Sequence, residues 1–145
     1  MKIRQASISD LEVVAHLARL LWGEDRSEEL QNEFAELLPR DDVGIFLAMH
    51  DDVPVGFAQC QLRYDYVEGT QTSPVGYLEG VLVKENWRRQ GVARELVAAC
   101  QAWAKTKGSR EFASDCELAN MQSQALHRAL GFVEVNRIVC FVKTI

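Results

Sequence analysis

The chain has 145 residues, of which 48% are hydrophobic and 26% are charged, a composition that indicates one soluble globular domain over residues 1–145. Its net charge of −5 argues against a nucleic-acid partner, which needs a basic face, and is compatible with a cationic ligand. No apolar run approaches the roughly 20 residues that span a bilayer, and the N-terminus lacks a signal-peptide hydrophobic region, so we expect a cytoplasmic protein and no membrane partner.

The first half of the chain predicts a short strand, two helices and a set of strands. Residues 3–5 are the first strand candidate, and Ser9 with Glu12 has the spacing of a helix capping box. A second helix begins at Ser27 and ends before Pro39. Further strands are expected at residues 43–50, 55–64 and 75–83, with a polar loop at residues 65–74.

The second half predicts two helices and three short strands. One helix follows Gly91 and ends at Gly108, and another runs from Asn120 to Gly131. The strands are expected at residues 111–115, 132–135 and 138–142. The order of elements indicates one mixed α/β (α+β) domain with about six to seven strands and about four helices.

The four cysteines favour reduced thiols. They lie in apolar stretches without CxxC spacing, a pattern that predicts buried thiols rather than a disulfide framework or a zinc site: Cys60, Cys100, Cys116 and Cys140. We therefore expect no metal.

The stretch from Tyr77 to Leu96 organises the rest of the chain. It reads as a buried strand, then a short basic loop with a glycine, then a helix. Unpaired backbone N–H groups and the helix dipole meet at such a helix N-terminus, which makes it an anion site. We expect this loop to hold the pyrophosphate of coenzyme A.

Two motifs in the chain are typical of the GNAT acetyltransferase superfamily. Residues 88–93, with the sequence Arg-Arg-Gln-Gly-Val-Ala, fit the [Q/R]-x-x-G-x-[G/A] signature, and Asn120 followed by a helix ending in Ala-Leu-Gly-Phe (129–132) fits its partner motif. A single short glycine pattern is weak, but both at this separation are specific. The whole chain further resembles the bacterial aminoglycoside 6′-N-acetyltransferases, through segments from both halves: residues 20–22, 65–69, 73–80, 113–115 and 127–132.

The resemblance implies a GNAT-type domain with a mixed, mostly antiparallel sheet, and acetyl-CoA as co-substrate. The strand edge would offer backbone groups to the pantetheine arm, an N–H there would stabilise the oxyanion, and the loop N–H groups would wrap the pyrophosphate. Asn120 resembles a coenzyme-contacting residue and also suits a helix N-cap. The residues expected to bind the coenzyme are Val81, Leu82, Val83, Arg89, Gln90, Gly91, Val92, Ala93, Arg94 and Asn120.

Glu79 is the candidate base or amine ligand. A carboxylate within an apolar strand is costly unless it is paired or lies at a site, and alternation puts its side chain on one face with Tyr77 and Val81. An ammonium cannot attack a thioester, so a base must first remove a proton. The alternative is a structural ion pair with a nearby arginine.

Four further residues are expected to bind the acceptor, each with a structural alternative. Asp115, at the end of a strand, is expected to hold the cationic sugar but could be a turn residue. Trp22 and Tyr66 would be aromatic walls, although Trp22 could equally be a core residue. Asn136 would line the acceptor site across the interface of a homodimer, which the resemblance alone implies, or be an ordinary exposed residue.

Two residues complete the sequence-based picture. His127 stands where many GNAT enzymes have a tyrosine that protonates the leaving thiolate, and we assign no acid to it. Cys116 has no histidine near it in sequence, so direct transfer in a ternary complex is favoured over an acyl-cysteine. The alternative functions are acetylation of another amine, such as a polyamine, a protein N-terminus or a lysine, and a non-catalytic coenzyme A-binding module.

Overall fold

The computed structural model describes all residues 1–145 and places one sheet between two layers of helices. The strands are β1 (Lys2–Gln5), β2 (Val43–His50), β3 (Val53–Arg63), β4 (Val75–Val83) and β5 (Phe112–Ser114), and they lie in that order in one five-stranded sheet. The pairs β1–β2, β2–β3 and β3–β4 are antiparallel, and β4–β5 is parallel. The mixed, mostly antiparallel sheet is therefore confirmed.

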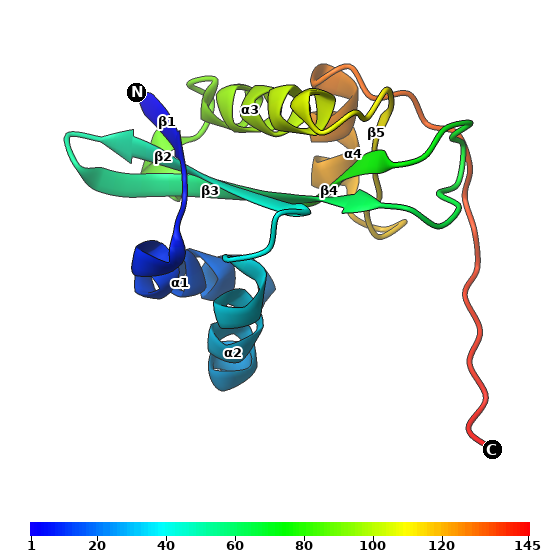
Figure 1. The fold of residues 1–145 in the computed structure, drawn as a ribbon, viewed down its shortest axis with the longest axis horizontal. Helices are drawn as coiled ribbons and strands as arrows, with labels where there is room; N and C mark the ends of the chain where they lie inside the picture. Colours follow the sequence, from blue (N-terminus) through cyan, green and yellow to red (C-terminus); the bar gives the residue numbers. More distant parts are fainter.

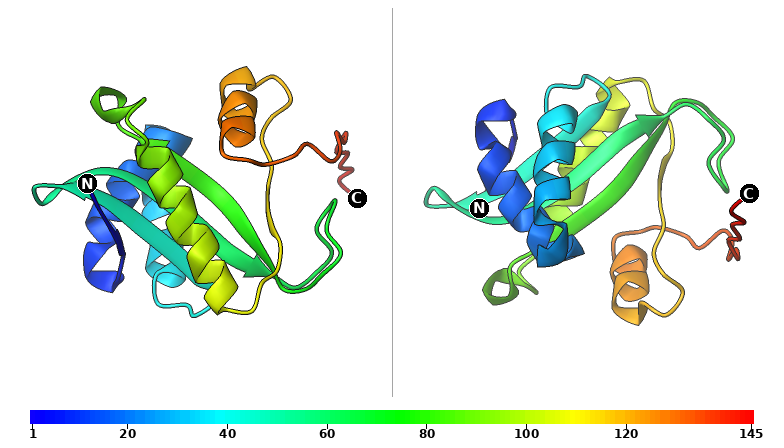
Figure 2. Two further views of the ribbon diagram at one scale, coloured as in Figure 1. Left: turned by 90° about the horizontal axis from the view of Figure 1, so that it is seen from above. Right: turned by 90° about the horizontal axis from the view of Figure 1, so that it is seen from below.

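The helices are α1 (Leu11–Trp22), α2 (Ser27–Leu37), α3 (Val92–Thr106) and α4 (Met121–Ala129). Figure 1 shows α3 above the sheet and α1 with α2 below it, and Figure 2 shows the same layers from above and from below. None of these helices combines the length and apolarity that a membrane span requires.

Hydrophobic periodicity explains how the helices cover the sheet. Val14, Leu17 and Ala18 of α1 recur at helical spacing and are fully buried, together with Phe34 of α2 and Phe57 of β3, in a cluster of 11 buried residues. On the opposite face, α3 contributes to a cluster of 14 buried residues. The sheet is thus covered on both faces, and the site must lie at its end or at an edge.

The start of α1 differs from the expected capping box. A 3₁₀ turn (Ile8–Asp10) precedes the helix, and the Asp10 carboxylate accepts hydrogen bonds from the Ser7 N–H at 2.9 Å and from Arg4 at 2.8 and 2.9 Å. The prediction of Ser9 with Glu12 was wrong because the capping box forms two residues earlier, between Ser7 and Asp10, where Arg4 of β1 also binds the Asp10 carboxylate.

Strand β4 contains a β-bulge at Glu79. Gln59 lies opposite Gly80 and Cys60 lies opposite Leu78, so Glu79 has no opposite residue. Leu78 and Val81 consequently both pack on the α3 side, and the expected alternation that put Val81 on the face of Tyr77 and Glu79 is wrong. The extra residue reverses the in–out order of every residue after it.

The two C-terminal strands expected at residues 132–135 and 138–142 are not formed, so the sheet has five strands instead of six to seven. After α4 the chain passes to the α1–α2 side of the sheet and descends at the right-hand side of Figure 1, apart from those two helices. Val139, Phe141 and Val142 are 78%, 92% and 97% exposed. Their sequence suits a strand, but a strand forms only beside another strand, and within this single chain the segment meets none.

The cysteine prediction was right for two of the four thiols. Cys60 and Cys100 are buried, whereas Cys116 and Cys140 are exposed, and all four are free. A hydrogen bond with Cys60, together with burial, raises the pKa of the Cys100 thiol. Cys116 is exposed because it follows β5 in a loop, and Cys140 because it lies in the extended C-terminal segment.

Phe34 offers a test of the core between α1, α2 and the sheet. Its ring lies 6.2 Å from that of Trp22 and 6.3 Å from that of Phe57. We expect Phe34→Ala to lower the free energy of unfolding by about 3–5 kcal/mol, because the lost ring leaves a cavity, as measured by urea denaturation. Leu118→Ala, at a side chain that is 64% exposed, is the control and should change it by less than about 0.5 kcal/mol. Equal losses in both variants would contradict the assigned core.

Candidate active site

The loop between β4 and α3 leaves the N-terminus of α3 open. The Arg88 Nε donates to the Val83 carbonyl at 2.9 Å, and Arg89 and Gly91 adopt positive φ angles of 61° and 80°. Gly91 is the N-cap residue, and no side chain caps the helix. A Cβ at Gly91 would meet no atom within 4 Å, so no other group packs over this residue. The first N–H groups of α3 lack a side-chain acceptor, as an anion site requires.

The side chains of the loop make structural contacts. The Gln90 amide donates to the Asn86 carbonyl at 3.3 Å, and the Arg94 guanidinium donates to the Ala129 carbonyl at 2.9 Å, which ties α3 to the end of α4. Val92 is buried, and Ala93 packs against the same core. The backbone N–H groups of these residues, rather than their side chains, are therefore the groups available to bind an anion.

Strand β4 loses its β5 neighbour next to the bulge. The parallel pairing ends with Leu78 opposite Ser114, and beyond it β4 and the chain towards α4 diverge (Figure 2). Val81, Leu82 and Val83 follow this point, so on that side their stretch of β4 has no strand neighbour. Their backbone is available to an extended ligand, while their side chains pack in the two cores.

The start and the last turn of α4 are both held by hydrogen bonds. The Asn120 side chain is the N-cap and accepts the Ser123 N–H at 3.0 Å. His127 lies with Nδ1 2.7 Å from the Ser123 carbonyl oxygen and Nε2 2.8 Å from the Ser114 hydroxyl oxygen. Its imidazole therefore joins α4 to β5, a structural role at a position where the sequence left its function open.

Glu79 and Asp115 belong to one cluster on the α1–α2 side of the sheet, together with Arg63 and Tyr77. The Arg63 guanidinium donates to Oε1 of Glu79 at 2.9 Å and to Oε2 at 3.0 and 3.2 Å. The guanidinium carbon lies 3.5 Å from the centre of the Tyr77 ring. The Tyr77 hydroxyl donates in turn to the Asp115 carboxylate. The arginine pair considered as an alternative for Glu79 is thus present.

Sequence reasoning missed Arg63 and Tyr77 as members of this cluster. The signal for Arg63 was its alternation with Gln59 and Gln61, which puts three polar side chains on one face of β3. The signal for Tyr77 was its position two residues before Glu79. Neither signal identifies a partner, because the contact crosses between β3 and β4.

The electrostatic balance around Glu79 is negative. Burial raises the pKa of the Glu79 carboxyl above its usual value, Arg63 opposes this effect, and the nearby carboxylates of Asp115 and Glu33 add to it. Burial and the Asp115 charge also raise the pKa of Tyr77, so its hydroxyl stays protonated and can donate. The three carboxylates outnumber the two guanidinium groups beside them, Arg63 at Glu79 and Arg26 at Glu33, so the environment attracts cations.

Of the three remaining acceptor candidates, Trp22 packs against the core, while Tyr66 and Asn136 lie at the loop after β3. Trp22 packs edge-on against Phe57 and covers Gly80, where a Cβ would come within 2.6 Å of the indole, so it has a core role beside Glu79. Tyr66 is 76% exposed in the loop after β3. Asn136 donates to Glu68 of that loop at 2.6 Å and does not lie between two strands.

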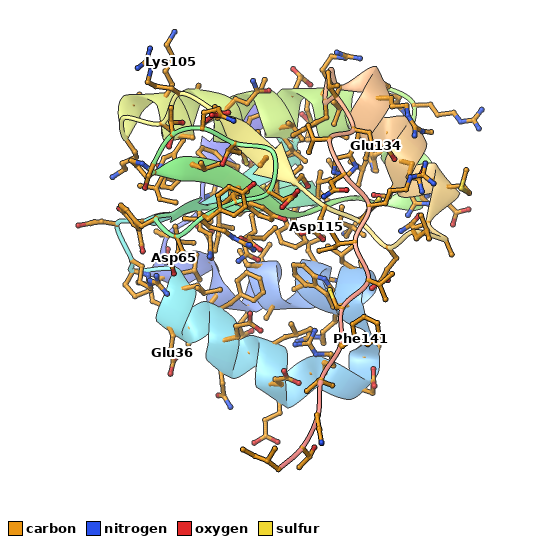
Figure 3. The ribbon with its side chains drawn as sticks, turned by 90° about the vertical axis from the view of Figure 1, so that its right-hand side faces the viewer. Glu36, Asp65, Lys105, Asp115, Glu134 and Phe141 are labelled. Atoms are coloured by element: carbon orange, nitrogen blue, oxygen red, sulfur yellow. The ribbon has the colours of Figure 1, made fainter.

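Figure 3 shows how this side of the molecule is arranged. Asp115 lies near the centre of the view, at the level between the sheet and the α1–α2 layer, while Asp65, the neighbour of Tyr66, lies towards its edge. No group of three or more His, Cys, Asp or Glu side chains is arranged to hold a metal ion.

Comparison with known proteins places this geometry in a family. Residues 11–132 match the acetyltransferase (GNAT) family. An aminoglycoside N(6′)-acetyltransferase type 1 of Stenotrophomonas maltophilia is 45% identical over 142 residues, covering 96% of this chain and 90% of the relative. The protein of the same name from Salmonella enteritidis is 41% identical over 143 residues, 99% of each chain.

A solved structure gives the same result in three dimensions. The structure of AAC(6′)-Iy in complex with the bisubstrate analog CoA-S-monomethyl-acetylneamine superposes with a TM-score of 0.94 at 40% identity, covering 99% of this chain and 98% of that one. The similarity therefore includes the whole fold, from β1 to the C-terminal segment.

Proposed function

The chain belongs to the GNAT acetyltransferase family, and from this premise we propose that it transfers the acetyl group of acetyl-CoA to the 6′-amine of aminoglycoside antibiotics. Acetylation of that amine removes a positive charge from the drug and confers resistance on the cell. The observation that carries the proposal is the pair of carboxylates, Glu79 and Asp115, beside the point where β4 and β5 separate. The names of relatives at 41% and 45% identity support the choice of acceptor.

The chain binds acetyl-CoA through backbone groups. The edge of β4 at Val81, Leu82 and Val83 holds the pantetheine arm in an extended conformation, and an N–H there stabilises the thioester oxygen as it gains negative charge. The N–H groups from Arg89 to Arg94 bind the pyrophosphate at the α3 N-terminus, and Asn120 contacts the coenzyme while it caps α4.

The reaction is a direct transfer in a ternary complex. Glu79 binds the 6′-ammonium and accepts its proton, directly or through a water molecule, so that the nitrogen has a free electron pair. The nitrogen attacks the thioester carbonyl to give a tetrahedral intermediate, which expels the coenzyme A thiolate. The nitrogen loses its second proton, the thiolate takes up a proton and leaves as the free thiol, and an amide remains. Much of the rate comes from holding the amine and the thioester together. Asp115 binds a further ammonium of the drug, and Trp22, Tyr66 and Asn136 border the sugar rings.

We further propose that the protein works in the cytoplasm as a homodimer. The C-terminal segment of residues 138–145 carries a β-branched and aromatic surface with nothing over it, and an exposed apolar segment of this kind marks an interface. The outer edge of β5 has no strand neighbour either, and unpaired edges recruit strands. A second copy of the chain supplies both missing partners in one symmetric interface.

Transfer to a 6′-amine is tested by following thiol release from acetyl-CoA with kanamycin or tobramycin as acceptor. We expect saturable turnover, and loss of susceptibility in a sensitive host that expresses the protein. The control acceptor is an aminoglycoside with a hydroxyl in place of the 6′-amine, which should give no turnover. Absence of turnover with every 6′-amino aminoglycoside would refute the proposal, and an acceptor screen of polyamines and peptides would then identify another amine or a silent coenzyme-binding module.

The two carboxylates are tested by isosteric substitution. Glu79→Gln and Asp115→Asn should each lower kcat/KM for the aminoglycoside at least about tenfold, because each removes a charge that binds the polycation, equivalent to about 1.4 kcal/mol. The KM for acetyl-CoA should stay constant. Glu36→Gln removes the same charge from α2, away from the cluster, and should leave both parameters unchanged. Full activity in both site variants would put the acceptor site elsewhere.

The oligomeric state is tested by light scattering after gel filtration. We expect about twice the chain mass of 16.4 kDa for the full chain and the monomer mass after removal of residues 138–145. Phe141→Asp should weaken the dimer, because the Phe141 side chain is 92% exposed in the single chain and would be buried at the interface. Lys143→Ala in the same segment should leave the dimer unchanged. A full chain that runs as a monomer would contradict the proposal.

A further inference from the structure

Arg63 holds Glu79 by an unusually complete set of contacts. Its Nη2 donates to both carboxylate oxygens, at 2.9 and 3.0 Å, and its Nε donates to Oε2 at 3.2 Å. The flat face of the guanidinium lies on the Tyr77 ring at 3.5 Å, which restricts it to one orientation. The Arg63 guanidinium therefore fixes the Glu79 carboxylate, and stacking on the Tyr77 ring fixes the guanidinium.

The two carboxylates near Glu79 oppose its charge. Asp115 comes from the segment after β5, and Glu33, which is 3.7 Å from Arg26, comes from α2. The Glu79 side chain is only 19% exposed, so burial acts in the same direction as the two carboxylates. Arg63, from the end of β3, is the one group beside Glu79 that stabilises its charged form.

The arrangement also leaves one acceptor position of Glu79 unused. A carboxylate offers about four lone-pair positions, and the contacts from Arg63 take two on Oε2 and one on Oε1. The remaining position on Oε1 is the one that can accept a hydrogen bond from an ammonium or from a water molecule. The partial exposure of the side chain keeps this position within reach of solvent.

We propose that Arg63 is the positioning residue of the acceptor site: held flat by Tyr77, it keeps Glu79 ionised and directs the free position of Oε1 towards the incoming amine. Tyr77 joins the two halves of the site, because its ring supports Arg63 and its hydroxyl holds Asp115. Without Arg63, the buried Glu79 carboxylate would take up a proton more readily. The positive charge of Arg63 therefore serves the site even though the proposed substrate is a polycation. This inference rests on the proposed function for its substrate, but its effect on Glu79 is present without one.

The first test is the titration of Glu79 in the ligand-free protein, followed by carbon-13 NMR of labelled glutamate and assigned with Glu79→Gln. In Arg63→Met, which keeps the side-chain length without the charge, the midpoint should rise by at least one pH unit. In Arg63→Lys, which keeps the charge but loses the planar fork, the midpoint should rise by less. An unchanged Glu79 midpoint in Arg63→Met would overturn the proposal.

The matched control is Arg40→Met. Arg40 also makes a two-pronged pair with a carboxylate, with bonds of 2.7 and 2.9 Å to Asp42, but on an exposed surface outside the cluster. This variant loses the same charge and a similar ion pair, so it should leave both the Glu79 titration and the activity unchanged. A rise of the Glu79 midpoint in Arg40→Met equal to that in Arg63→Met would show a general charge effect and refute the specific role.

The second test uses the pH dependence of kcat/KM for a 6′-amino aminoglycoside. Well below both midpoints, kcat/KM of Arg63→Met should fall to about a tenth of the wild-type value for each pH unit by which the Glu79 midpoint rises, and the ratio of variant to wild type should return towards one as the pH rises. A purely structural role predicts the same loss at every pH, and that result would overturn the proposal. If the wild type acetylates no aminoglycoside, the proposed function fails while the NMR titration still decides the role of Arg63.

Discussion

The β-bulge at Glu79 is the constraint on which the site depends. One extra residue in β4 reverses the order of its side chains, so that Leu78 and Val81 both reach the α3 core. The same local irregularity comes directly after the last residue of β4 that pairs with β5. The bulge on the β3 side and the end of pairing with β5 therefore meet at one point of β4, and Glu79 lies at that point.

The Glu79 carboxylate is buried at the bulge, and Arg63 of the neighbouring strand β3 supplies a compensating positive charge. Burial and two nearby carboxylates disfavour the charge on Glu79, and Arg63 and Tyr77 compensate for this across the β3–β4 pair. The compensation is partial, because the pKa of Glu79 stays above its usual value. A carboxylate in this condition is a better proton acceptor than an ordinary glutamate.

The C-terminal segment is linked to the acceptor side of the molecule. Val135 packs so closely against Gly69 that a Cβ there would come within 2.4 Å of it, and Asn136 bonds to Glu68. Both contacts fall on the loop that carries Tyr66, between β3 and β4. The base of the segment is therefore anchored where the acceptor is expected, while its tip, residues 138–145, is exposed. The C-terminal segment proposed for the dimer interface is therefore joined, through Val135 and Asn136, to the loop that carries Tyr66.

Much of the architecture could be predicted from the sequence, because local patterns encode it. The bounds expected for β2 and β4 agree with the structure, and α3 begins after Gly91 with no side-chain cap, as its glycine and basic loop indicated. Asn120 caps α4, one of the two roles considered for it. Hydrophobic periodicity, capping residues and glycine positions depend on neighbours within a few residues, so a single sequence contains them.

The remaining features were decided by tertiary structure. The Arg4–Asp10 bond, the bulge at Glu79 and the Arg63–Tyr77–Asp115 contacts all join residues from different elements. The C-terminal strands have a strand-like sequence, yet a strand exists only when another strand accepts its hydrogen bonds. The sequence by itself therefore determined the four helices, the five strands that form, and the strand–loop–helix passage from β4 to α3. Only the folded chain decided which charged groups meet, since the free energy of a charge depends on its burial and on its partners across the sheet.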